Sequence, residues 1–443
     1  MAPRPWRRLL PLVLLAPLAL AGLARSQPQP APEQQAQPLL SDADAVAAAV
    51  LRANPEIEAL SAHVQAMEQG VPQAGVWADP MVGVEYSNMP LTAPYPGAHP
   101  MAGVQLRVSQ ALPAPGKIGA RQALARQRVT ADRSAIPVRQ NELVAMVRTL
   151  YHELALHRQL AEVTRQHIAL VEQLSDVVQI AYEVGRAAQH ELMQLQVLAD
   201  RLRDDLEDLG QRERSSLARL NAALHRNEGG PIETPAQTAL PELAPSLDAW
   251  VRRVQADQPE LARFVEAAKV EGVAADRADA ERHPDVTLTL GYRVRRATEM
   301  GDAGEDFVTL GAQMPLPWLW NDERWGAEAA QHRAARRALE ASRDALADAL
   351  RGRVDAALER FRRSRDKTER YEETLIPEAH RALDSTFAAY RVGRADFGSV
   401  YQAELLLLDL ERAVRMARSE AARAAVEVEM LAGAYVPVTE EER

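Results

Sequence analysis

The chain contains the stretch Tyr182-Glu183-Val184-Gly185-Arg186-Ala187 and carries a near copy, Tyr390-Arg391-Val392-Gly393-Arg394-Ala395, 208 residues later. Other landmarks recur at a spacing of 204 residues: Asn54-Pro55-Glu56 with Gln258-Pro259-Glu260, Asp79-Pro80 with His283-Pro284, and Leu112-Pro113 with Leu316-Pro317. A long period with only two copies indicates duplication of a domain-sized unit rather than a solenoid. We therefore predict a first repeat at 41–226 and a second at 246–433, joined by a linker at 227–245.

The composition favours long helices and argues against some classes of function. Hydrophobic residues make up 47% of the 443 residues, aromatic residues only 5%, and the formal net charge is −10. A negative charge without any basic, aromatic-rich cluster argues against a nucleic-acid partner. Because the sequence has no cysteine, it cannot form disulfides, zinc–thiolate sites or a thiol nucleophile.

The first 26 residues have the pattern of a signal peptide. Arginines at positions 4, 7 and 8 precede an apolar run at 9–23, and Ala24-Arg25-Ser26 is a small-x-small cleavage pattern. A membrane anchor is the alternative, but two prolines interrupt the run, and a spanning helix needs about 20 apolar residues. Residues 27–40 are predicted to be a disordered linker, and residues 434–443 a C-terminal tail.

Four segments alternate between apolar and small or polar residues, which predicts half-buried strands. They are 82–89, 103–112, 285–295 and 305–315, paired as the hairpins 82–112 and 285–315. The predicted lipid-facing positions are Val84, Tyr86, Leu106, Leu288, Leu290 and Leu310. The pattern is that of outer-membrane strands, and a soluble hairpin with one face on a core is the alternative. Since four strands are too few to close a barrel, either strands of several chains combine or the sheet stays open.

Each hairpin is followed by sequence that predicts a pair of long helices. The first helical hairpin is expected at 117–224 and the second at 322–432. The stretch from 117 to about 183 corresponds to roughly 100 Å of helix, with a kink at Pro137. Two offset apolar stripes in it, one passing through His157 and the other through His167, predict neighbours on two sides, as in a ring of helices. Gly185 and Gly393 are expected to end helices in the left-handed conformation.

No catalytic signature is present in the sequence. There is no Gly-rich phosphate loop and no HExxH pattern, and the ten histidines are scattered over different predicted elements. We interpret these histidines as solvated or packed between helices. Met81, Met89 and Met101 are interpreted as packing or loop residues rather than ligands of a soft metal. We therefore expect neither enzymatic activity nor a cofactor.

The order of these motifs resembles the TolC-type outer-membrane efflux factors. The resemblance is carried by Asn54-Pro55-Glu56, by Ala78-Asp79-Pro80 before a hairpin, by Leu112-Pro113-Ala114-Pro115-Gly116-Lys117 at the start of a long helix, and by Tyr-x-Val-Gly-x in both repeats. It covers essentially the whole chain after the signal peptide. The Pro-Gly-Lys segment is most similar to the branch that partners heavy-metal resistance-nodulation-division pumps.

This resemblance implies a mainly α fold with a small β part. Tandem antiparallel helical hairpins would form a coiled-coil tunnel across the periplasm. Three chains with four strands each would form one 12-stranded barrel in the outer membrane of a Gram-negative bacterium. The implied function is the passive channel of a tripartite efflux system with a periplasmic adaptor and an inner-membrane pump, with metal cations among the implied substrates. The alternative is a soluble periplasmic coiled-coil scaffold or adaptor.

The resemblance also assigns roles to residues at the repeated turns. It implies adaptor-docking tips formed by Val184, Gly185, Arg186, Val392, Gly393 and Arg394. Acidic residues that line the closed periplasmic entrance of known members follow the second tip, but here those positions are Ser399 and Gln402. Glu191, Asp396 and Glu404 are therefore the candidates for the entrance.

Overall fold

The fold was established from a computed structural model of the chain. It describes residue 40 and residues 42–88, 90–92, 95, 99–227, 229–244, 246–297, 301, 303–316, 319 and 322–435. All of these residues belong to one compact unit. The predicted signal peptide, the predicted linker up to residue 39, Met89, and residues 436–443 of the predicted tail lie outside the described residues.

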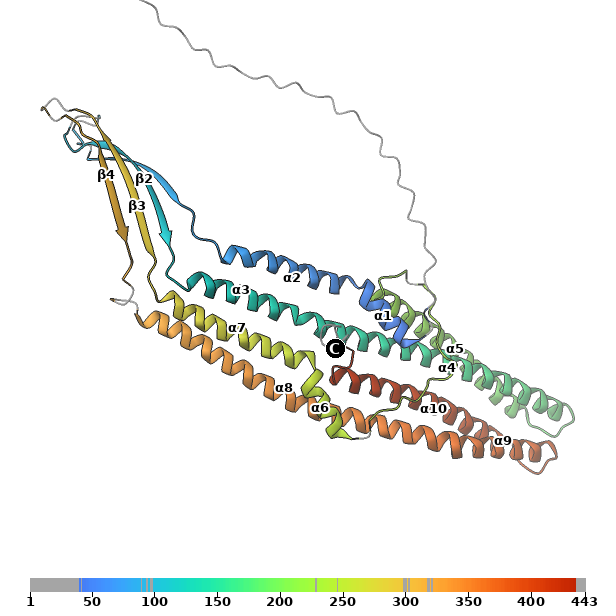
Figure 1. Cartoon of the computed structure of the whole chain (residues 1–443). Helices are drawn as coiled ribbons and strands as arrows, with labels where there is room; N and C mark the ends of the chain where they lie inside the picture. The colour runs from blue at the N-terminus through green and yellow to red at the C-terminus, as the bar shows by residue number, and fades with distance from the viewer. Residues whose placement is uncertain are drawn as a thin grey trace, which may run out of the picture. The chain divides into compact units, whose positions relative to one another are not determined.

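The first half of the chain forms two short helices, a β-hairpin and a pair of long helical segments (Figure 1). In chain order these elements are α1 (Ala43–Ala53), α2 (Pro55–Ala74), β1 (Met81–Ser87), β2 (Gly103–Leu112), α3 (Lys117–Arg133), α4 (Ala135–Glu183) and α5 (Gln189–Ala223). The strands begin and end within two residues of the predicted ranges.

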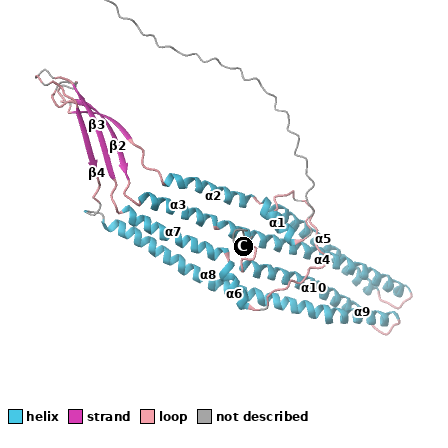
Figure 2. Cartoon of the chain, in the orientation of Figure 1, coloured by secondary structure: helices cyan, strands magenta, loops and turns pink. Residues whose placement is uncertain are grey.

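The second half repeats this order of elements. They are α6 (Leu247–Asp257), α7 (Pro259–Glu281), β3 (Val286–Arg295), β4 (Phe307–Gln313), α8 (Asp322–Arg370), the π-helical segment η2 (Tyr371–Leu375), α9 (Ile376–Arg391) and α10 (Phe397–Leu431). The prediction of a mainly helical chain with a small β part is thereby confirmed (Figure 2).

The four strands form a single antiparallel sheet with the order β1-β2-β3-β4. Its central pair takes one strand from each half of the chain, so the sheet joins the halves. Leu106 lies opposite Val84 and Tyr292, and Leu290 lies opposite Leu310. Since directly opposed residues share a face, the apolar positions predicted from alternation lie together on one face.

The helices lie side by side in a layer (Figure 1). Near the sheet, α3 packs against α2 and α7, and α7 packs against α8. Farther from the sheet, α4 lies between α5 and α10, and α10 packs against α8 and α9. One edge of the layer is therefore formed by α2 and α5, and the other by α8 and α9.

The repeated Asn54 and Gln258 connect the short helices to the long ones. Asn54 Oδ1 accepts a hydrogen bond from Glu56 N at 2.8 Å, which caps α2, and its amide donates to Ala223 O at the end of α5. Gln258 caps α7 in the same way and donates to Leu431 O at 2.7 Å, at the end of α10. The proline that follows each cap suits the first helical position, where no N–H is needed.

Proline interrupts both long helices, but differently. The expected kink at Pro137 is a break at Ser134, between α3 and α4. Proline lacks an N–H and its ring collides with the carbonyl four residues earlier, which here belongs to Arg133, the last residue of α3. The second long helix was predicted without interruption, yet η2 lies just before Pro377 and Ile376 N donates to Tyr371 O. A π turn widens the helix where proline cannot continue the regular pattern.

The Gly116-Lys117 segment of the sequence resemblance fastens α3 to the second half of the chain. Gly116 adopts a left-handed φ of 92° directly before α3. Lys117 is only 4% exposed, and its Nζ lies 3.3 Å from Glu281 and 2.9 Å from Asp285. Arg121 also pairs with Glu281, at 2.7 Å. The lysine therefore serves as the buried cation of a cluster between α3 and the α7–β3 connection.

Candidate functional site

The first turn between long helices has the backbone pattern of a Schellman motif. Gly185 has a φ of 70°, its N–H donates to Tyr182 O at 2.9 Å, and Arg186 N donates to Ala181 O at 2.7 Å. These bonds satisfy the last carbonyls of α4. Val184, the C-cap residue, is 64% exposed. The turn therefore presents an apolar side chain to solvent at the end of a rigid helix.

The second turn has the same geometry, as the repeated hexad predicts. Gly393 has a φ of 71°, its N–H donates to Tyr390 O at 2.9 Å, and Arg394 N donates to Ala389 O at 2.9 Å. Val392 is 67% exposed. An added Cβ at either glycine would meet no atom within 4 Å, so only the backbone conformation calls for glycine.

The two turns differ at the start of the returning helix. Asp396 caps α10, because its Oδ1 accepts from Ser399 N at 2.8 Å and from Ser399 Oγ at 3.0 Å. These hydrogen bonds lower the pKa of Asp396. The corresponding residue before α5 is Ala188, which offers no side-chain cap. Asp396 is thus an exposed, ionised helix cap that the first turn lacks.

Glu191 is held by the other half of the chain. Tyr390 OH donates a hydrogen bond of 3.0 Å to Glu191 Oε2, which links the end of α9 to the first turn of α5. Burial and this hydrogen bond raise the pKa of Tyr390 to about 12, so the phenol remains a donor well above neutral pH. The Tyr390 ring also contacts Phe397 edge-on, with centroids 6.4 Å apart. This link fixes the two turns relative to each other.

Glu404 does not lie with the other two acids proposed for the entrance. It is 1% exposed and lies between α4 and α10, where His167 Nδ1 is 2.6 Å from its Oε1. A side chain buried within one chain cannot line an entrance, so this part of the prediction is corrected. Two acids, Glu191 and Asp396, remain as candidates. The sequence offered a signal for the buried site in His167, a polar residue within an apolar stripe, but gave no partner for it.

The sheet exposes one continuous apolar face. Val84 is 73% exposed and Leu310 is 81% exposed, and Leu106, Leu288 and Leu290 on this face are exposed as well, whereas Tyr86 is half-buried. The other face carries polar pairs, such as Arg107 with Glu85 at 2.7 Å and Arg293 Nη2 with Gln105 Oε1 at 3.1 Å. Both edge strands, β1 and β4, have one side without a strand partner among the described residues. The sheet therefore has an apolar face, a polar face and two open edges.

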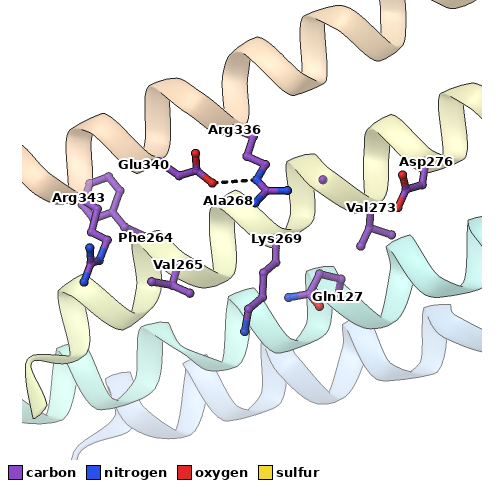
Figure 3. Close-up of a pocket in the computed structure, with 11 residues that line it drawn as sticks. Gln127, Phe264, Val265, Ala268, Lys269, Val273, Asp276, Arg336, Glu340 and Arg343 are labelled. Atoms are coloured by element: carbon purple, nitrogen blue, oxygen red, sulfur yellow. Dashed lines mark hydrogen bonds and ion pairs between the residues drawn. The ribbon is translucent and has the colours of Figure 1, made fainter. Parts of the chain in front are cut away.

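A groove of about 600 Å³ crosses α7 between α3 and α8 (Figure 3). Phe264, Val265 and Val273 supply its apolar part, and Arg336 with Glu340, an ion pair at 2.8 Å, lies on its α8 side. No residue predicted for a tip, an entrance or a lipid-facing strand lines it. The groove is open to solvent, and charged side chains of α7 and α8 line it beside the apolar ones.

The described residues provide no metal centre. In this part of the chain, no group of three or more His, Cys, Asp or Glu side chains could hold a metal ion. Met81 and Met101, whose sulfurs were weighed as soft ligands, are exposed side chains at the hairpin. Of the helices that the structure describes, none is both long enough and apolar enough to cross a membrane.

Comparison with known proteins relates this fold to outer-membrane channels. No protein-family model matches the chain, and no curated protein sequence matches it either. Three similar solved structures are the outer-membrane channel OprN, the outer membrane protein VceC of Vibrio cholerae, and the outer membrane channel MtrE of Neisseria gonorrhoeae in its open state.

These likenesses cover nearly the whole chain at low sequence identity. OprN is 14% identical with a TM-score of 0.71, over 89% of this chain and 91% of its own. VceC is 16% identical with a TM-score of 0.71, over 88% and 96%. MtrE is 14% identical with a TM-score of 0.70, over 88% of each chain. At the level of the fold, the resemblance to TolC-type outer-membrane channels is confirmed.

Proposed function

We propose that this chain, which has the fold of outer-membrane channel proteins, is the channel of a tripartite efflux system in a Gram-negative outer membrane. Three copies would form a 12-stranded barrel in lipid and a helical tunnel in the periplasm. Transport would be passive and without catalysis, and the inner-membrane pump would supply the energy. The observation that carries the proposal is the four-stranded sheet with one exposed apolar face and two open edges.

The dimensions of the sheet suit a bilayer. Ten residues in each of β2 and β3 span about 33 Å along the strand, which corresponds to about 25 Å of height at the strand tilt of outer-membrane barrels. Trp77 precedes β1 at the helix end of the sheet, and Tyr86 and Tyr292 lie near the opposite end of the apolar face. Aromatic side chains at both ends of an apolar band are typical of membrane–water interfaces.

The contacts made within the chain support the closure of a ring. At the centre of the chain, repeat 1 meets repeat 2 through β2–β3, α3–α7 and α4–α10. If repeat 2 of one copy met repeat 1 of another copy in the same way, the equivalent contacts would be β4 with β1, α8 with α2, and α9 with α5. All six of these lie at the open edges, so a second copy can meet the first in three matching places. A head-to-tail interface of this kind forms a ring where its rotation closes, and we propose that it closes as a homotrimer.

The two turns are the proposed docking points for the periplasmic adaptor. Val184 with Arg186 and Val392 with Arg394 recur at the end of the helices opposite the sheet, and the Schellman geometry fixes their backbone shape. For the pump we propose the resistance-nodulation-division type, with metal cations as a substrate class, on the sequence resemblance of the Pro-Gly-Lys segment. Growth of a deletion strain on metal salts and on drugs, with the chain restored as control, tests this substrate class.

Membrane fractionation separates the channel from a soluble scaffold. The channel should stay in the outer membrane after alkaline extraction, migrate as a trimer, and give single-channel conductance in planar bilayers. A soluble periplasmic protein without conductance would instead support the scaffold alternative.

The entrance is proposed to favour cations through Glu191 and Asp396, repeated three times around the axis. The matched test variant is Glu191→Gln with Asp396→Ser, because glutamine still accepts from Tyr390 and serine still caps α10. Its reversal potential in a salt gradient should show weaker cation preference than that of the native channel. An unchanged reversal potential would remove both residues from the entrance.

A further inference from the structure

A buried histidine joins the two long-helix pairs of the chain. His167 of α4 is 3% exposed. Its Nδ1 lies 2.6 Å from Glu404 Oε1, and its Nε2 lies 3.2 Å from Glu411 Oε2, both on α10. A neutral imidazole has one N–H and a protonated one has two. With a carboxylate at each ring nitrogen, the arrangement is complete only when His167 is charged.

The surroundings of this cluster are apolar, so its charged groups are destabilising unless they are paired. His167 lies on the α4 stretch between Val163 and Val171, and these pack in one apolar cluster with Leu407 and Leu408 of α10. Glu404 is 1% exposed, and its Oε2 accepts no hydrogen bond from the part of the chain that the structure describes. A buried carboxylate without a positive partner is strongly destabilising. Separation of α4 from α10 or loss of the proton would each remove that partner.

Each helix packed at this point contributes charged groups. From α9, His380 Nε2 lies 3.1 Å from Glu411 Oε1 and extends the chain of contacts to the surface. On α10, Arg412 pairs with Asp205 of α5 at 3.0 Å and donates to Thr164 Oγ1 of α4.

Another charged group of α5 near this level is engaged on the outer side. Arg203 pairs with Glu172 of α4 and with Asp200, each at 2.7 Å. The two carboxylates that reach the His167 ring are therefore those of α10.

We propose that His167, Glu404, Glu411 and His380 form a proton-dependent clasp, which holds the α4–α5 pair against the α9–α10 pair and loosens in alkali. This His167 clasp concerns contacts within one chain and does not depend on the proposed channel function. It lies 18 residues before Gly185, about 27 Å along α4 from the first turn. Loosening there would free the ends of both helix pairs to separate.

The direction of the pH effect follows from the titration of the ring. Burial by itself lowers the pKa of His167, but the hydrogen bonds and charges of Glu404 and Glu411 outweigh it and raise the pKa to about 9. Since the unfolded-state pKa is about 6.5, the stabilisation is complete below pH 6.5 and is lost as the pH rises through about 9. The pKa of Glu411 is lowered despite its burial, mainly by His167, so neutral pH keeps His167 and Glu411 charged.

The equivalent contact between α5 of one copy and α9 of another would lack a matching arrangement. At the spacing of 208 residues, Gln196 of α5 corresponds to Glu404, Arg203 to Glu411, and Leu375 of η2 to His167. These three residues include neither a histidine nor a carboxylate. The contact between α4 and α10 is therefore expected to titrate in alkali, whereas its counterpart between α9 and α5 of another copy is not.

Spin labels on the two turns test the clasp directly. Because the sequence has no cysteine, Glu183→Cys and Arg391→Cys can carry the only two nitroxide labels of a chain, diluted with unlabelled chains. The distance distribution, measured by pulsed electron resonance from pH 6 to pH 10, should be narrow at pH 7. It should become longer and broader with a midpoint near pH 9. In His167→Gln, this transition should be absent between pH 7 and pH 10.

Two further variants keep the test decisive. His157→Gln is the matched control, since His157 lies on α4 but faces Ser216 of α5, and the midpoint near pH 9 should be retained. Glu411→Gln removes one carboxylate and should move the midpoint down by at least one pH unit. A native distance that is constant from pH 6 to pH 10, or a midpoint that His167→Gln leaves unchanged, would overturn the clasp. Conductance is not measured here, so failure of the channel proposal would be seen only in the bilayer experiment.

Discussion

The two repeats have the same order of elements, but their long helices adjust to proline in different ways. In the first repeat, Pro137 follows a complete break at Ser134, near the level where α1 and α2 meet α4. In the second, Pro377 follows η2, and the axis continues into α9. The landmark spacing grows from 204 at the Leu-Pro pair to 208 at the turns, so the second repeat has four more residues here. Equivalent folds thus tolerate different local solutions between their fixed points.

The features shared by the two repeats belong to the backbone, whereas the features that differ belong to side chains. The conserved features between the two copies are set by the backbone: a cap before proline at Asn54 and Gln258, and a left-handed residue at Gly185 and Gly393. The differences lie in side chains that face the other repeat. Such side chains have only one partner surface within the chain, so each copy can diverge to suit its own neighbour.

The largest effect is expected on the apolar face of the sheet. Val84 and Leu288 occupy equivalent positions in the two repeats. A change of either to Arg should cost about 2–4 kcal/mol near the bilayer midplane and impair assembly. Recovery of trimers from outer membranes measures this effect. Thr287→Arg, on the opposite face, is the control and should be tolerated; equal tolerance at positions 287 and 288 would contradict a lipid-facing sheet.

The next effect concerns the Lys117 cluster between α3 and the α7–β3 connection. Lys117→Met should destabilise the chain by about 2 kcal/mol, because Glu281 and Asp285 lose a buried cation while Arg121 remains. Arg121→Met removes a partly exposed partner of the same Glu281 and should cost less than 1 kcal/mol. Denaturant midpoints of the two variants compare them. A larger loss in Arg121→Met would show that Lys117 is not the main cation of this cluster.

The two turns should respond alike if both dock the adaptor. Gly185→Trp and Gly393→Trp place a bulky residue where a left-handed backbone costs roughly 1 kcal/mol or more. Trimer formation should persist because the turns are remote from the sheet, and crosslinking to the adaptor should be lost. Gly185→Ala and Gly393→Ala share the backbone cost without the bulk and separate the two causes. Retained crosslinking in the Trp variants would mean that the turns only end the helices. Loss of trimers would mean that the turns are needed for folding or assembly.

The smallest effect is expected at the paired caps. Asn54→Ala and Gln258→Ala should each cost about 1 kcal/mol, through loss of the cap on α2 or α7 and of the bond to the end of α5 or α10. Hydrogen exchange of the following helix should rise in the affected repeat only. Gln65→Ala, at an exposed position in the middle of α2, is a surface control. Exchange that rises equally in both repeats would mean that the caps act on the whole chain rather than on their own helices.

Most of the fold was predictable because it depends on local patterns. Alternation located the strands within two residues, and the repeated hexad located both turns with their left-handed glycines. Pro137 was recognised as an interruption, but the break falls three residues earlier. Pro377 was missed, since a single proline in a strongly helical stretch does not reveal how the backbone will adjust before it.

The candidate site was predicted less completely, because its contacts join residues far apart in the chain. The pair Tyr390–Glu191 spans 199 residues and the pair His167–Glu404 spans 237. Sequence proximity to the second turn placed Glu404 among the entrance acids, yet the helical rotation of α10 turns it inward toward α4. Residues a few positions apart on a helix can face opposite surroundings.

The sequence by itself determined the repeat plan, the strand faces, the caps and the turns, since each depends on residue type and spacing over a few positions. Tertiary structure alone decided that Lys117 is a buried cation between the halves, that Glu191 is held by Tyr390, and that His167 lies between two glutamates. Those facts depend on which helices become neighbours and at what rotation. Helix pairing is set by the packing of whole faces, and no local pattern in a single sequence records its outcome.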